Sequence, residues 1–578
     1  MPRSEPVLPV DSRRQTGAGR LLDDLGAALE VHLPEAEHAE AERLWRMHAL
    51  ELAEAVGWSD TQLVARPFPG GLSLALTSPV DALYGATEIN EAAWAAADAE
   101  RLGRPLPDRE DALARIRREI GDEHDSRLVA LLEAASSRGV PAIWDDETIT
   151  LGYGARGQSW APEALPEPGA VNWDSLGAIP LALVTGTNGK STTVRILAGM
   201  AEAAGETAGV STTDYIAVGD EILDTGDYSG PMGARATLAD TRVTMGVLEV
   251  ARGGLLRRGL PVPVATTVAV TNVAADHLGE YGVMDVVALA ETKFLVAKAL
   301  QAGGTLVCPA DEPTATAEAR RLAPDLIARG VRMVWTALDP ADADRQLEDQ
   351  PSVCGAATVR DGVIVHQRAG EWVSICPVAD IPGSWDGTAE HVVRNALTAS
   401  ALGHALGLDD DALATGLRAF KGDPDDNPGR ANRFTVDGAT VVVDYAHNAH
   451  GLRALIQMAK HWPARRRLIL ASTAGDRSNA DLAAMADVLT TFEADRYLLC
   501  DAPGYLRGRP SGEIPRILEA ELVSRGIPPE SCTCFPGPLE SAHEALAWAR
   551  DGDVVLLPTM QQRDAVTAFV KSQAAEGE

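Results

Sequence analysis

The sequence is poor in lysine, cysteine and uninterrupted apolar stretches. Arginine carries most of the positive charge, and only six lysines occur among the 578 residues, namely Lys190, Lys293, Lys298, Lys421, Lys460 and Lys571. A lysine at a chemically important position is therefore informative, because a guanidinium cannot replace an amine that must react. The six cysteines are scattered and form no CxxC pair, so they indicate no zinc site and suit a reducing compartment.

Positive charge of any kind is scarce, since 51 Lys and Arg residues stand against 83 Asp and Glu residues and give a formal net charge of −32. Phosphate binding over a broad surface needs positive charge, so nucleic acids and anionic membranes are disfavoured as general partners. No stretch reaches the roughly 18 apolar residues of a membrane-spanning helix, and the N-terminal residues lack the apolar segment of a signal peptide. We therefore expect a cytoplasmic protein that binds neither nucleic acid nor membrane.

The chain is too long for one hydrophobic core, and at about 100 to 200 residues per domain three or four domains are expected. Residues 20–60 and 108–135 have the apolar spacing of amphipathic helices, and a short strand pair is expected near residues 144–153. The Pro-, Gly- and Ala-rich residues 159–173 predict a linker. We therefore place an α+β N-terminal domain at residues 1–165.

Beyond this point, apolar runs alternate with helical segments. The strands expected in the first series lie at residues 180–185, 244–250, 265–271 and 304–309, and those of the second series at 439–445, 467–473, 496–501 and 553–558. Such alternation predicts α/β domains with mainly parallel sheets and helices on both faces. The expected central domain covers residues 176–428, and a Rossmann-like C-terminal domain covers residues 430–578.

A glycine-rich turn, TGTNGKST at residues 185–192, joins the first of these strands to an amphipathic helix. Backbone N–H groups of such a turn cradle phosphates, Lys190 can reach the β- and γ-phosphates, and the Ser191 hydroxyl can bind Mg²⁺. The spacing differs from the general GxxxxGK[ST] loop, because Val184 stands where its first glycine should lie. A turn that only joins strand to helix would explain neither Lys190 nor Ser191.

The narrower form of this loop resembles the ATP loop of the Mur ligase superfamily. These enzymes phosphorylate a carboxylate with ATP, and an amine then displaces phosphate from the acyl phosphate to form an amide. The resemblance implies a P-loop parallel-sheet central domain that binds ATP. The loop residues that it assigns to the nucleotide are Thr187, Asn188, Gly189, Lys190, Ser191 and Thr192.

Two further motifs and one lysine match the family's magnesium residues. VLEVARGGLLRRG at residues 247–259 resembles its central glutamate motif, in the form of the cyanophycin synthetase branch, and TNVAADHLGEYG at 271–282 resembles TNxxxDHxG. Lys293 corresponds to a lysine that many members carboxylate with CO₂, giving a carbamate. The implied Mg²⁺ ligands are Ser191, Glu249, His277 and Lys293, and the implied catalytic residues are Lys190, Glu249, His277 and Lys293. A solvent-facing acid, a structural histidine and a surface lysine are the alternatives for Glu249, His277 and Lys293.

Four motif residues from the second half of the chain complete the implied nucleotide site. Asn395 would contact the adenine, Arg430 the phosphates after closure, Asp444 the ribose, and His447 the region of the phosphates. Val392 and Ala449 depart from the family pattern. STAGDRSNADL at residues 472–482 resembles a turn on the side of the second substrate.

Arg252, Arg257 and Arg258 form a local positive patch in this acidic chain, suited to a carboxylate or an acyl phosphate. A helix face with arginines in water is a nearly equal alternative for Arg257 and Arg258. Residues 138–160 resemble the end of the N-terminal domain of cyanophycin synthetase, but the ATP-grasp domain that follows there is missing.

The resemblance therefore implies an ATP-dependent acid–amino acid ligase. Its substrates would be a small-molecule amine, with arginine the first to test, and a carboxylated peptide or polymer. The alternative is a nucleotide-gated binding protein or accessory subunit that works with a separate polymer-forming ligase. Whether the chain forms a homo-oligomer or joins a partner ligase stays open.

Overall fold

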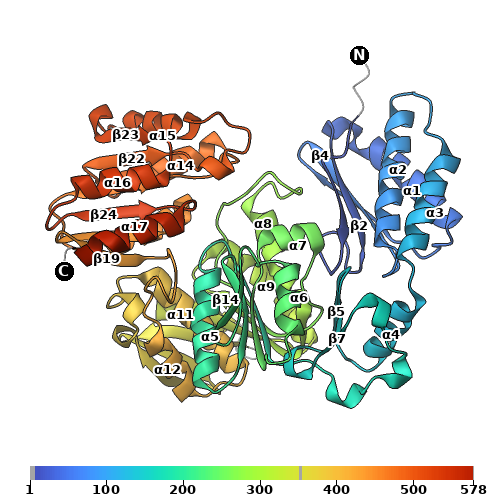
Figure 1. Cartoon of the computed structure of the whole chain (residues 1–578), viewed down its shortest axis with the longest axis horizontal. Coiled ribbons are helices and arrows are strands. Elements are labelled where there is room, and N and C mark those ends of the chain that lie inside the picture. Colours follow the sequence, from blue (N-terminus) through green and yellow to red (C-terminus); the bar gives the residue numbers. More distant parts are fainter. Residues whose placement is uncertain (1–6, 350–353, 577–578) are drawn as a thin grey trace.

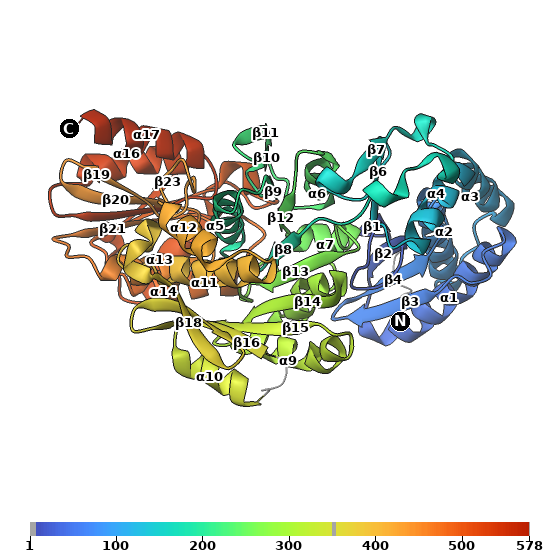
Figure 2. The same cartoon turned by 90° about the horizontal axis from the view of Figure 1, so that it is seen from below.

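The computed structural model describes residues 7–349 and 354–576. Three units follow one another along the longest axis of the molecule, with the N-terminal unit at one end, the central unit in the middle and the C-terminal unit at the other end (Figures 1 and 2). Among the helices of the described residues, none has the length and apolar character that crossing a bilayer requires.

The N-terminal unit is a four-stranded antiparallel sheet covered by helices, with the strand order β1-β2-β4-β3. A small three-stranded sheet, β5-β6-β7, closes the unit. Its strands are β1 Asp11–Gln15, β2 Gly26–His32, β3 Leu63–Phe68, β4 Gly71–Thr77, β5 Ala142–Trp144, β6 Ile149–Leu151 and β7 Gln158–Trp160. Its helices are α1 His38–Ala55, α2 Leu83–Arg101, α3 Arg109–Glu123 and α4 Ser126–Ser137. The expected α+β class and the strand pair at 144–153 are thus present.

Two helix predictions in this unit are correct only in part, since α1 lies within residues 20–60 and α3 and α4 cover most of residues 108–135. Residues 26–32, within the expected helix 20–60, form strand β2, which pairs with β1 and β4 on both sides. Tertiary pairing here overrides apolar spacing, because the run is buried between two strands. The expected helix 108–135 is two helices, since the Asp125 carboxylate accepts hydrogen bonds from the N–H groups of Arg127 and Leu128 and so caps a new helix, α4.

The expected linker at residues 159–173 contains no long helix or strand, but it packs against the rest of the protein. It continues from β7 into three short 3₁₀ turns, Pro162–Ala164, Pro168–Ala170 and Trp173–Ser175. Leu165 and Val171 are buried against Leu131 of α4, so the segment packs onto the N-terminal unit. The predicted domain boundaries themselves stay predictions.

The central unit contains an eleven-stranded sheet in the order β11-β10-β9-β12-β8-β13-β14-β15-β16-β17-β18. Pairing is parallel from β9 to β16 and antiparallel at both ends of the sheet. The strands are β8 Leu181–Thr185, β9 Ala208–Ser211, β10 Tyr215–Val218, β11 Glu221–Thr225, β12 Met245–Glu249, β13 Ala265–Val270, β14 Leu300–Pro309, β15 Arg332–Ala337, β16 Cys354–Arg360, β17 Val363–Arg368 and β18 Glu371–Pro377. All four strands expected in this series are confirmed.

Helices cover both faces of the parallel part, as predicted. Alternate residues of β8 show this, because Ala182 and Val184 belong to the apolar core beneath α5, α11 and α12, whereas Leu181 and Leu183 belong to the core beneath α6 to α9. The helices are α5 Lys190–Ala203, α6 Pro231–Ala239, α7 Arg252–Arg258, α8 Val286–Lys293, α9 Pro313–Ala328, α10 Pro340–Asp349, α11 Glu390–Ala405 and α12 Asp410–Ala419.

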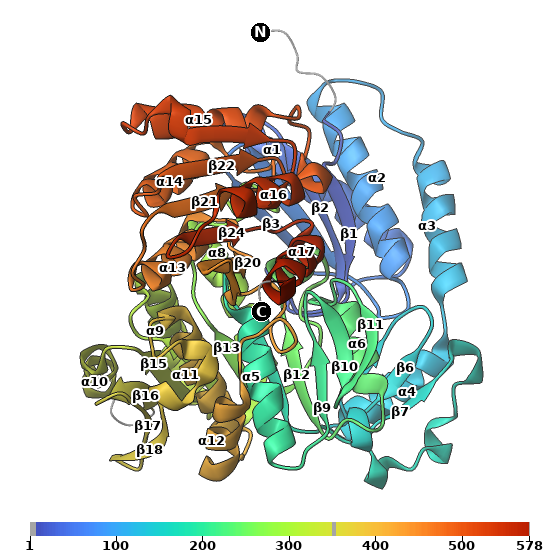
Figure 3. The ribbon, with the colours of Figure 1, turned by 60° about the vertical axis from the view of Figure 1, so that its left-hand side comes forward.

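The C-terminal unit is a six-stranded sheet in the order β19-β20-β24-β21-β22-β23, parallel except for the β19/β20 hairpin. Its strands are β19 Asn432–Val436, β20 Ala439–Asp444, β21 Arg467–Ala471, β22 Arg496–Cys500, β23 Cys532–Phe535 and β24 Val554–Pro558. Its helices are α13 Ala449–Lys460, α14 Asn479–Thr490, α15 Glu513–Ser524, α16 Pro538–Trp548 and α17 Arg563–Glu576. The four strands expected in the second series are confirmed, and Figure 3 shows this sheet above α5 and the central sheet.

Candidate active site

The carboxyl ends of three neighbouring parallel strands, β12, β8 and β13, form the floor of the candidate site. Strand β8 leads into the phosphate loop, β12 ends at Glu249, and β13 leads into Thr271 and Asn272. Ligands of open parallel sheets bind outside the carboxyl ends of the strands. Sequence motifs that lie up to about ninety residues apart are therefore neighbours here because the strands that carry them are hydrogen-bonded in register.

Two glycines of the loop adopt conformations that other residues avoid. Gly186 has φ 149° and Gly189 has φ 85°. A Cβ atom on Gly186 would lie 1.8 Å from Thr271 Oγ1, and one on Gly189 would lie 2.2 Å from Asn395 Oδ1. The loop can therefore turn into helix α5 only with glycine at both positions, and this leaves backbone N–H groups at a helix N-terminus, where anions bind.

Side chains after β13 hold the loop from beneath. The Asn188 N–H donates to Asn272 Oδ1 at 2.9 Å, and Thr271 Oγ1 donates to the Asn188 carbonyl at 2.7 Å. Thr187 Oγ1 donates to the Ala274 carbonyl at 3.1 Å. The loop is therefore held by its own domain, which lowers the entropic cost of ligand binding.

Lys190, Ser191 and Glu249 form a charged group at the start of α5. Ser191 Oγ donates to Glu249 Oε2 at 2.7 Å, and Lys190 Nζ lies 3.8 Å from Glu249 Oε1. Thr213 adds a hydroxyl donor to Glu249 Oε1 at 2.8 Å. Glu249 is only 2% exposed, so this carboxylate belongs to the site and is not a solvent-facing acid at a strand end.

Lys293, at the last position of α8, is buried, with only 3% exposed. Its Nζ donates to the Gly186 carbonyl at 2.8 Å. Burial lowers the pKa of Lys293 well below its ordinary value, and the positive charge of Lys190 lowers it further. The surface-lysine alternative is therefore wrong, and the structure places an amine with a strongly lowered pKa beneath the phosphate loop.

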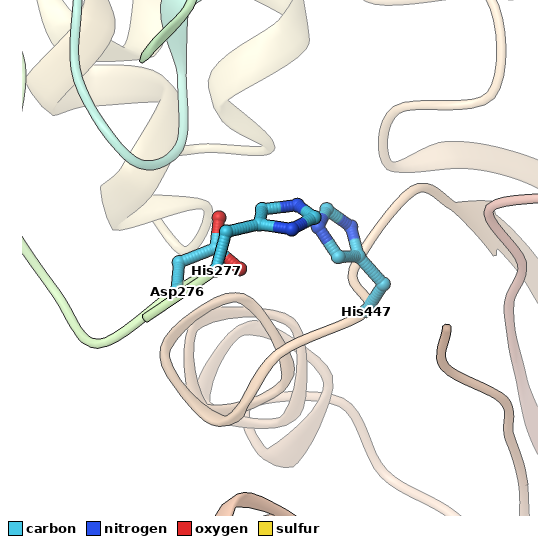
Figure 4. Close-up of side chains that lie close together, drawn as sticks. All are labelled: Asp276, His277 and His447. Atoms are coloured by element: carbon cyan, nitrogen blue, oxygen red, sulfur yellow. The ribbon is translucent and has the colours of Figure 1, made fainter. Parts of the chain in front are cut away.

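His277 faces the C-terminal unit and stands near Asp276 and His447. One ligand atom from each of these three residues lies within 4.8 Å of the others. In Figure 4 the rings of His277 and His447 face each other from the central and C-terminal units. Imidazole nitrogens with a carboxylate are ligands that suit transition metals, whereas the oxygens of Ser191 and Glu249 suit Mg²⁺.

Hydrogen bonds and charges hold this histidine pair. His277 Nδ1 lies 3.2 Å from Asp476 Oδ2, and His447 Nδ1 lies 2.9 Å from the Tyr445 carbonyl. Burial would raise the pKa of Asp276, but the Arg477 guanidinium at 2.6 Å, with the two histidines, holds it below its usual range. Burial lowers the pKa of His447. Asp276, His277 and His447 therefore lie beside the turn at residues 472–482, at the interface between the central and C-terminal units.

The remaining predicted residues also border this region. Arg430 Nη2 donates to Ser191 Oγ at 3.1 Å. The Asp444 carboxylate accepts 2.7 Å hydrogen bonds from the N–H groups of Ala431 and Ala446, so it fixes the connection between the two units. Asn395 lies over Gly189 of the phosphate loop. The adenine and ribose contacts assigned to Asn395 and Asp444 stay predictions.

The carboxylate that organises Arg430 was not predicted from the sequence. Asp214, in the loop after β9, contacts Arg195 at 2.5 Å, Arg430 at 2.8 Å and Arg563 at 2.8 Å. Burial would raise the pKa of Asp214, but the three guanidinium groups hold it below its usual range. No motif in the sequence marks Asp214, because its partners lie on α5, in the segment just before β19 and on α17.

All of the predicted site residues line one cavity of about 1810 Å³. It contains the loop residues 187–192 together with Glu249, His277, Lys293, Asn395, Arg430, Asp444 and His447. A Gly-rich loop at a helix N-terminus fits a nucleoside triphosphate, and two buried oxygen donors beside a lysine fit the Mg²⁺ that accompanies it. The cavity also continues towards the N-terminal unit, where Tyr84 and Asp146 line it.

Comparisons with known proteins place these features in a family. The model of the Mur ligase middle domain matches residues 184–351, and that of the Mur ligase glutamate ligase domain matches residues 429–558. The cyanophycin synthetase of Nostoc sp. is 32% identical over 352 residues, which is 61% of this chain but 37% of that protein. The chain thus spans well under half the length of the cyanophycin synthetases that it matches.

Two other proteins extend the comparison. The ligand-free bifunctional folylpolyglutamate synthase/dihydrofolate synthase of Yersinia pestis has a TM-score of 0.49 and 20% identity, over 68% of this chain and 90% of that chain. The UDP-N-acetylmuramate–L-alanine ligase of Kineococcus radiotolerans is 31% identical over 381 residues, 64% of this chain and 70% of that protein. With both domain models matched in order and this relative covered over most of its length, the chain belongs to the Mur ligase family, a family of ATP-dependent carbon–nitrogen ligases.

Proposed function

We propose that the chain joins an amino acid to a carboxylate of an acidic peptide or polymer, at the expense of ATP and through an acyl phosphate. The observation that carries this proposal is a single cavity that holds the phosphate loop, the Ser191–Glu249 oxygen pair and the buried amine of Lys293. A protein that only binds nucleotide has no use for such an amine beside the metal ligands.

In this proposal Lys190 contacts the β- and γ-phosphates, and Ser191 and Glu249 hold Mg²⁺. His277 and a carbamate formed from Lys293 and CO₂ complete the ligands for a second divalent cation. Carbamate formation requires a neutral amine, and the burial that lowers the pKa of Lys293 favours that form. The cations would neutralise the charge that develops on the phosphates during transfer.

The reaction itself has two steps. A carboxylate oxygen of the acid attacks the γ-phosphorus of ATP, the bond to ADP breaks, and an acyl phosphate forms. The neutral amine then attacks the acyl carbon, inorganic phosphate leaves, and the amine loses one proton. Arg430, which contacts both Asp214 and Ser191, would carry the C-terminal unit against the phosphates and help to exclude water from the acyl phosphate.

The similarity to cyanophycin synthetases favours an acidic peptide or polymer as the acid and arginine as the first amine to test. One observation favours a second candidate, a nucleotide-gated accessory subunit of a separate polymer-forming ligase. The match covers 37% of the Nostoc enzyme, and an accessory role beside a separate ligase is compatible with this partial match.

Product analysis by mass spectrometry tests the proposal. The protein is incubated with ATP, Mg²⁺ and a panel of aspartyl and glutamyl peptides crossed with amino acids, and Lys190→Ala serves as the blank. We expect a product with the mass of acid plus amine minus water that is absent from the blank. ATP binding without any product across the panel would favour the accessory subunit.

The variant Lys293→Arg separates catalysis from binding, because a guanidinium keeps a positive charge but forms no carbamate. We expect turnover to fall at least 100-fold while ATP binding, measured by calorimetry, is retained. Unchanged turnover would contradict the role of Lys293.

A further inference from the structure

Three arginines line the cavity on the side that faces the N-terminal unit. They are Arg235 of α6 and Arg257 and Arg258 of α7, and we call them the basic cluster. Helix α7 packs against β1, and α6 lies beside the segment that contains β6 and β7 (Figures 2 and 3). The cluster therefore sits where the central and N-terminal units meet, at the opposite side of the cavity from the C-terminal unit.

Within the described residues, no arginine of the basic cluster forms an ion pair. Each arginine donates to a neutral oxygen: Arg235 to Thr16 Oγ1 at 3.3 Å, Arg257 to the Gly253 carbonyl at 3.2 Å, and Arg258 to the Arg14 carbonyl at 2.9 Å. Over residues 7–349 and 354–576, no carboxylate oxygen lies within 4.0 Å of a nitrogen of the cluster. In contrast, Arg252 on the same helix pairs with Glu280.

Nearby charges of both signs act on the basic cluster. Burial lowers the pKa of Arg258, and the guanidinium groups of Arg14 and Arg257 lower it further. Burial also lowers the pKa of Arg235, although Asp145 and Asp146 oppose this. Asp146 is itself paired with Arg14 at 3.4 Å. Arg235 and Arg258 are partly buried and Arg257 is exposed. In a chain with a net charge of −32, three arginines beside a cavity without an ion-pair partner among the described residues form a site for an anion.

The position of α7 sets the distance between this site and the reaction centre. The helix starts three residues after Glu249, which borders the phosphate loop, and its seven residues lead to Arg258. Seven helical residues span about 10 Å, which is about three residues of extended peptide. One molecule can therefore reach from the phosphate loop to the basic cluster if it is peptide-like and several residues long.

We propose that the basic cluster binds a second, remote carboxylate of the acid substrate, about three residues from the carboxylate that is phosphorylated. This inference rests on the proposed function, because it describes the acid of that reaction. The preferred acid is then a peptide with two carboxylates at this spacing. A single amino acid is too short to contact both ends of the cavity.

Calorimetric binding measurements test the proposal directly, in the presence of Mg²⁺ and a non-hydrolysable ATP analogue. The probes are N-acetylated aspartyl and glutamyl peptides of two to five residues, each with a free C-terminal carboxylate and as its C-terminal amide. For peptides of about four residues we expect the free acid to bind about 10- to 100-fold more tightly than its amide, because a charge-assisted hydrogen bond is lost in the amide.

The variants Arg257→Gln and Arg258→Gln should abolish this preference, so that the free acid binds no more tightly than its amide. Arg257 is exposed and bonds only within its own helix, so its replacement leaves the fold intact. Arg258→Lys should keep part of the preference. Arg242→Gln removes a positive charge from the same unit, outside the cavity, and serves as the matched control.

Equal affinities within every acid and amide pair would overturn the proposal, and so would a preference that survives both glutamine variants. The product analysis described above distinguishes this failure from failure of the proposed function. If ligation products form but the free-acid peptides bind no more tightly than their C-terminal amides, the ligase proposal stays intact and the anion site is contradicted. If the free-acid peptides bind more tightly but no ligation product forms, the ligase proposal is contradicted and the anion site is supported.

Discussion

At the scale of single residues, burial decides what each titratable group can do. Lys293 stood out in the sequence because lysine is rare, and the structure places it where its amine has a strongly lowered pKa. Glu249 was expected from its motif at a strand end. The structure adds its hydrogen bond with Ser191, which no spacing along the chain predicts.

A second buried group, His366, gives a stability prediction. Burial, with Arg368 and His404 nearby, lowers the pKa of His366 to about 3, and its Nε2 lies 2.9 Å from Ser400 Oγ. The unfolded chain has the ordinary pKa of about 6.5 and so binds more protons between these values. This contribution to stability is full above pH 6.5 and is lost as the pH falls towards 3, by up to about 1.4 kcal/mol per pH unit.

Urea unfolding of wild type and His366→Gln between pH 4 and 7 measures this effect. The free energy of unfolding of the wild type should fall more steeply with decreasing pH than that of the variant. Parallel curves would show that His366 titrates normally in the folded protein.

At the scale of helices and strands, local signals placed most elements and failed where pairing or capping intervened. The alternation of apolar runs predicted four parallel strands of each sheet, because strands buried on both faces are continuously apolar. The parallel strands β9, β15, β16 and β23 were not predicted. Strand β2 was missed since its pairing with β1 and β4 outweighs its spacing. Asp214 was missed because Arg430, one of its partners, is 216 residues away.

Asp214 ties three elements together, so its removal should be costly. In Asp214→Asn the guanidinium groups of Arg195, Arg430 and Arg563 lose their shared carboxylate. Loss of one member of a buried ion pair destabilises by about 3–5 kcal/mol. We also expect the KM for ATP to rise by about tenfold, because Arg430 is no longer held against Ser191.

The control for this prediction is Asp240→Asn, which removes a carboxylate that pairs with the exposed Arg242. Such a surface pair contributes about 0–1 kcal/mol. Urea unfolding and ATP titrations compare the two variants. Similar losses of stability in both would contradict the role of Asp214.

At the scale of the whole molecule, the apolar cores are distributed unequally. The sheet and helices α1 and α2 of the N-terminal unit surround a core of their own. A single larger core includes Val194 of α5, Leu397 of α11 and Ile456 of α13, and so joins the central and C-terminal units. The two units that form the nucleotide end of the cavity are therefore coupled by apolar contact as well as by Asp214.

Calorimetry of thermal unfolding should reflect this division. We expect two transitions, and ATP with Mg²⁺ should raise the Tm of only the one that belongs to the central and C-terminal units. At a ligand concentration of 100 times Kd the stabilisation is about 2.7 kcal/mol. Lys190→Ala should show both transitions but a much smaller shift. One transition that shifts as a whole would mean that the N-terminal unit unfolds with the rest.

The sequence by itself determined the family, the phosphate loop and four parallel strands of each large sheet. These depend on short-range patterns that are visible in the sequence, namely turn glycines, apolar runs and strand-end side chains. The tertiary structure alone decided the partners of Asp214, the pairing of His277 with His447 and the exposure of the basic cluster to the cavity. Each of these joins residues from different units, and such contacts arise only when distant strands and helices pack.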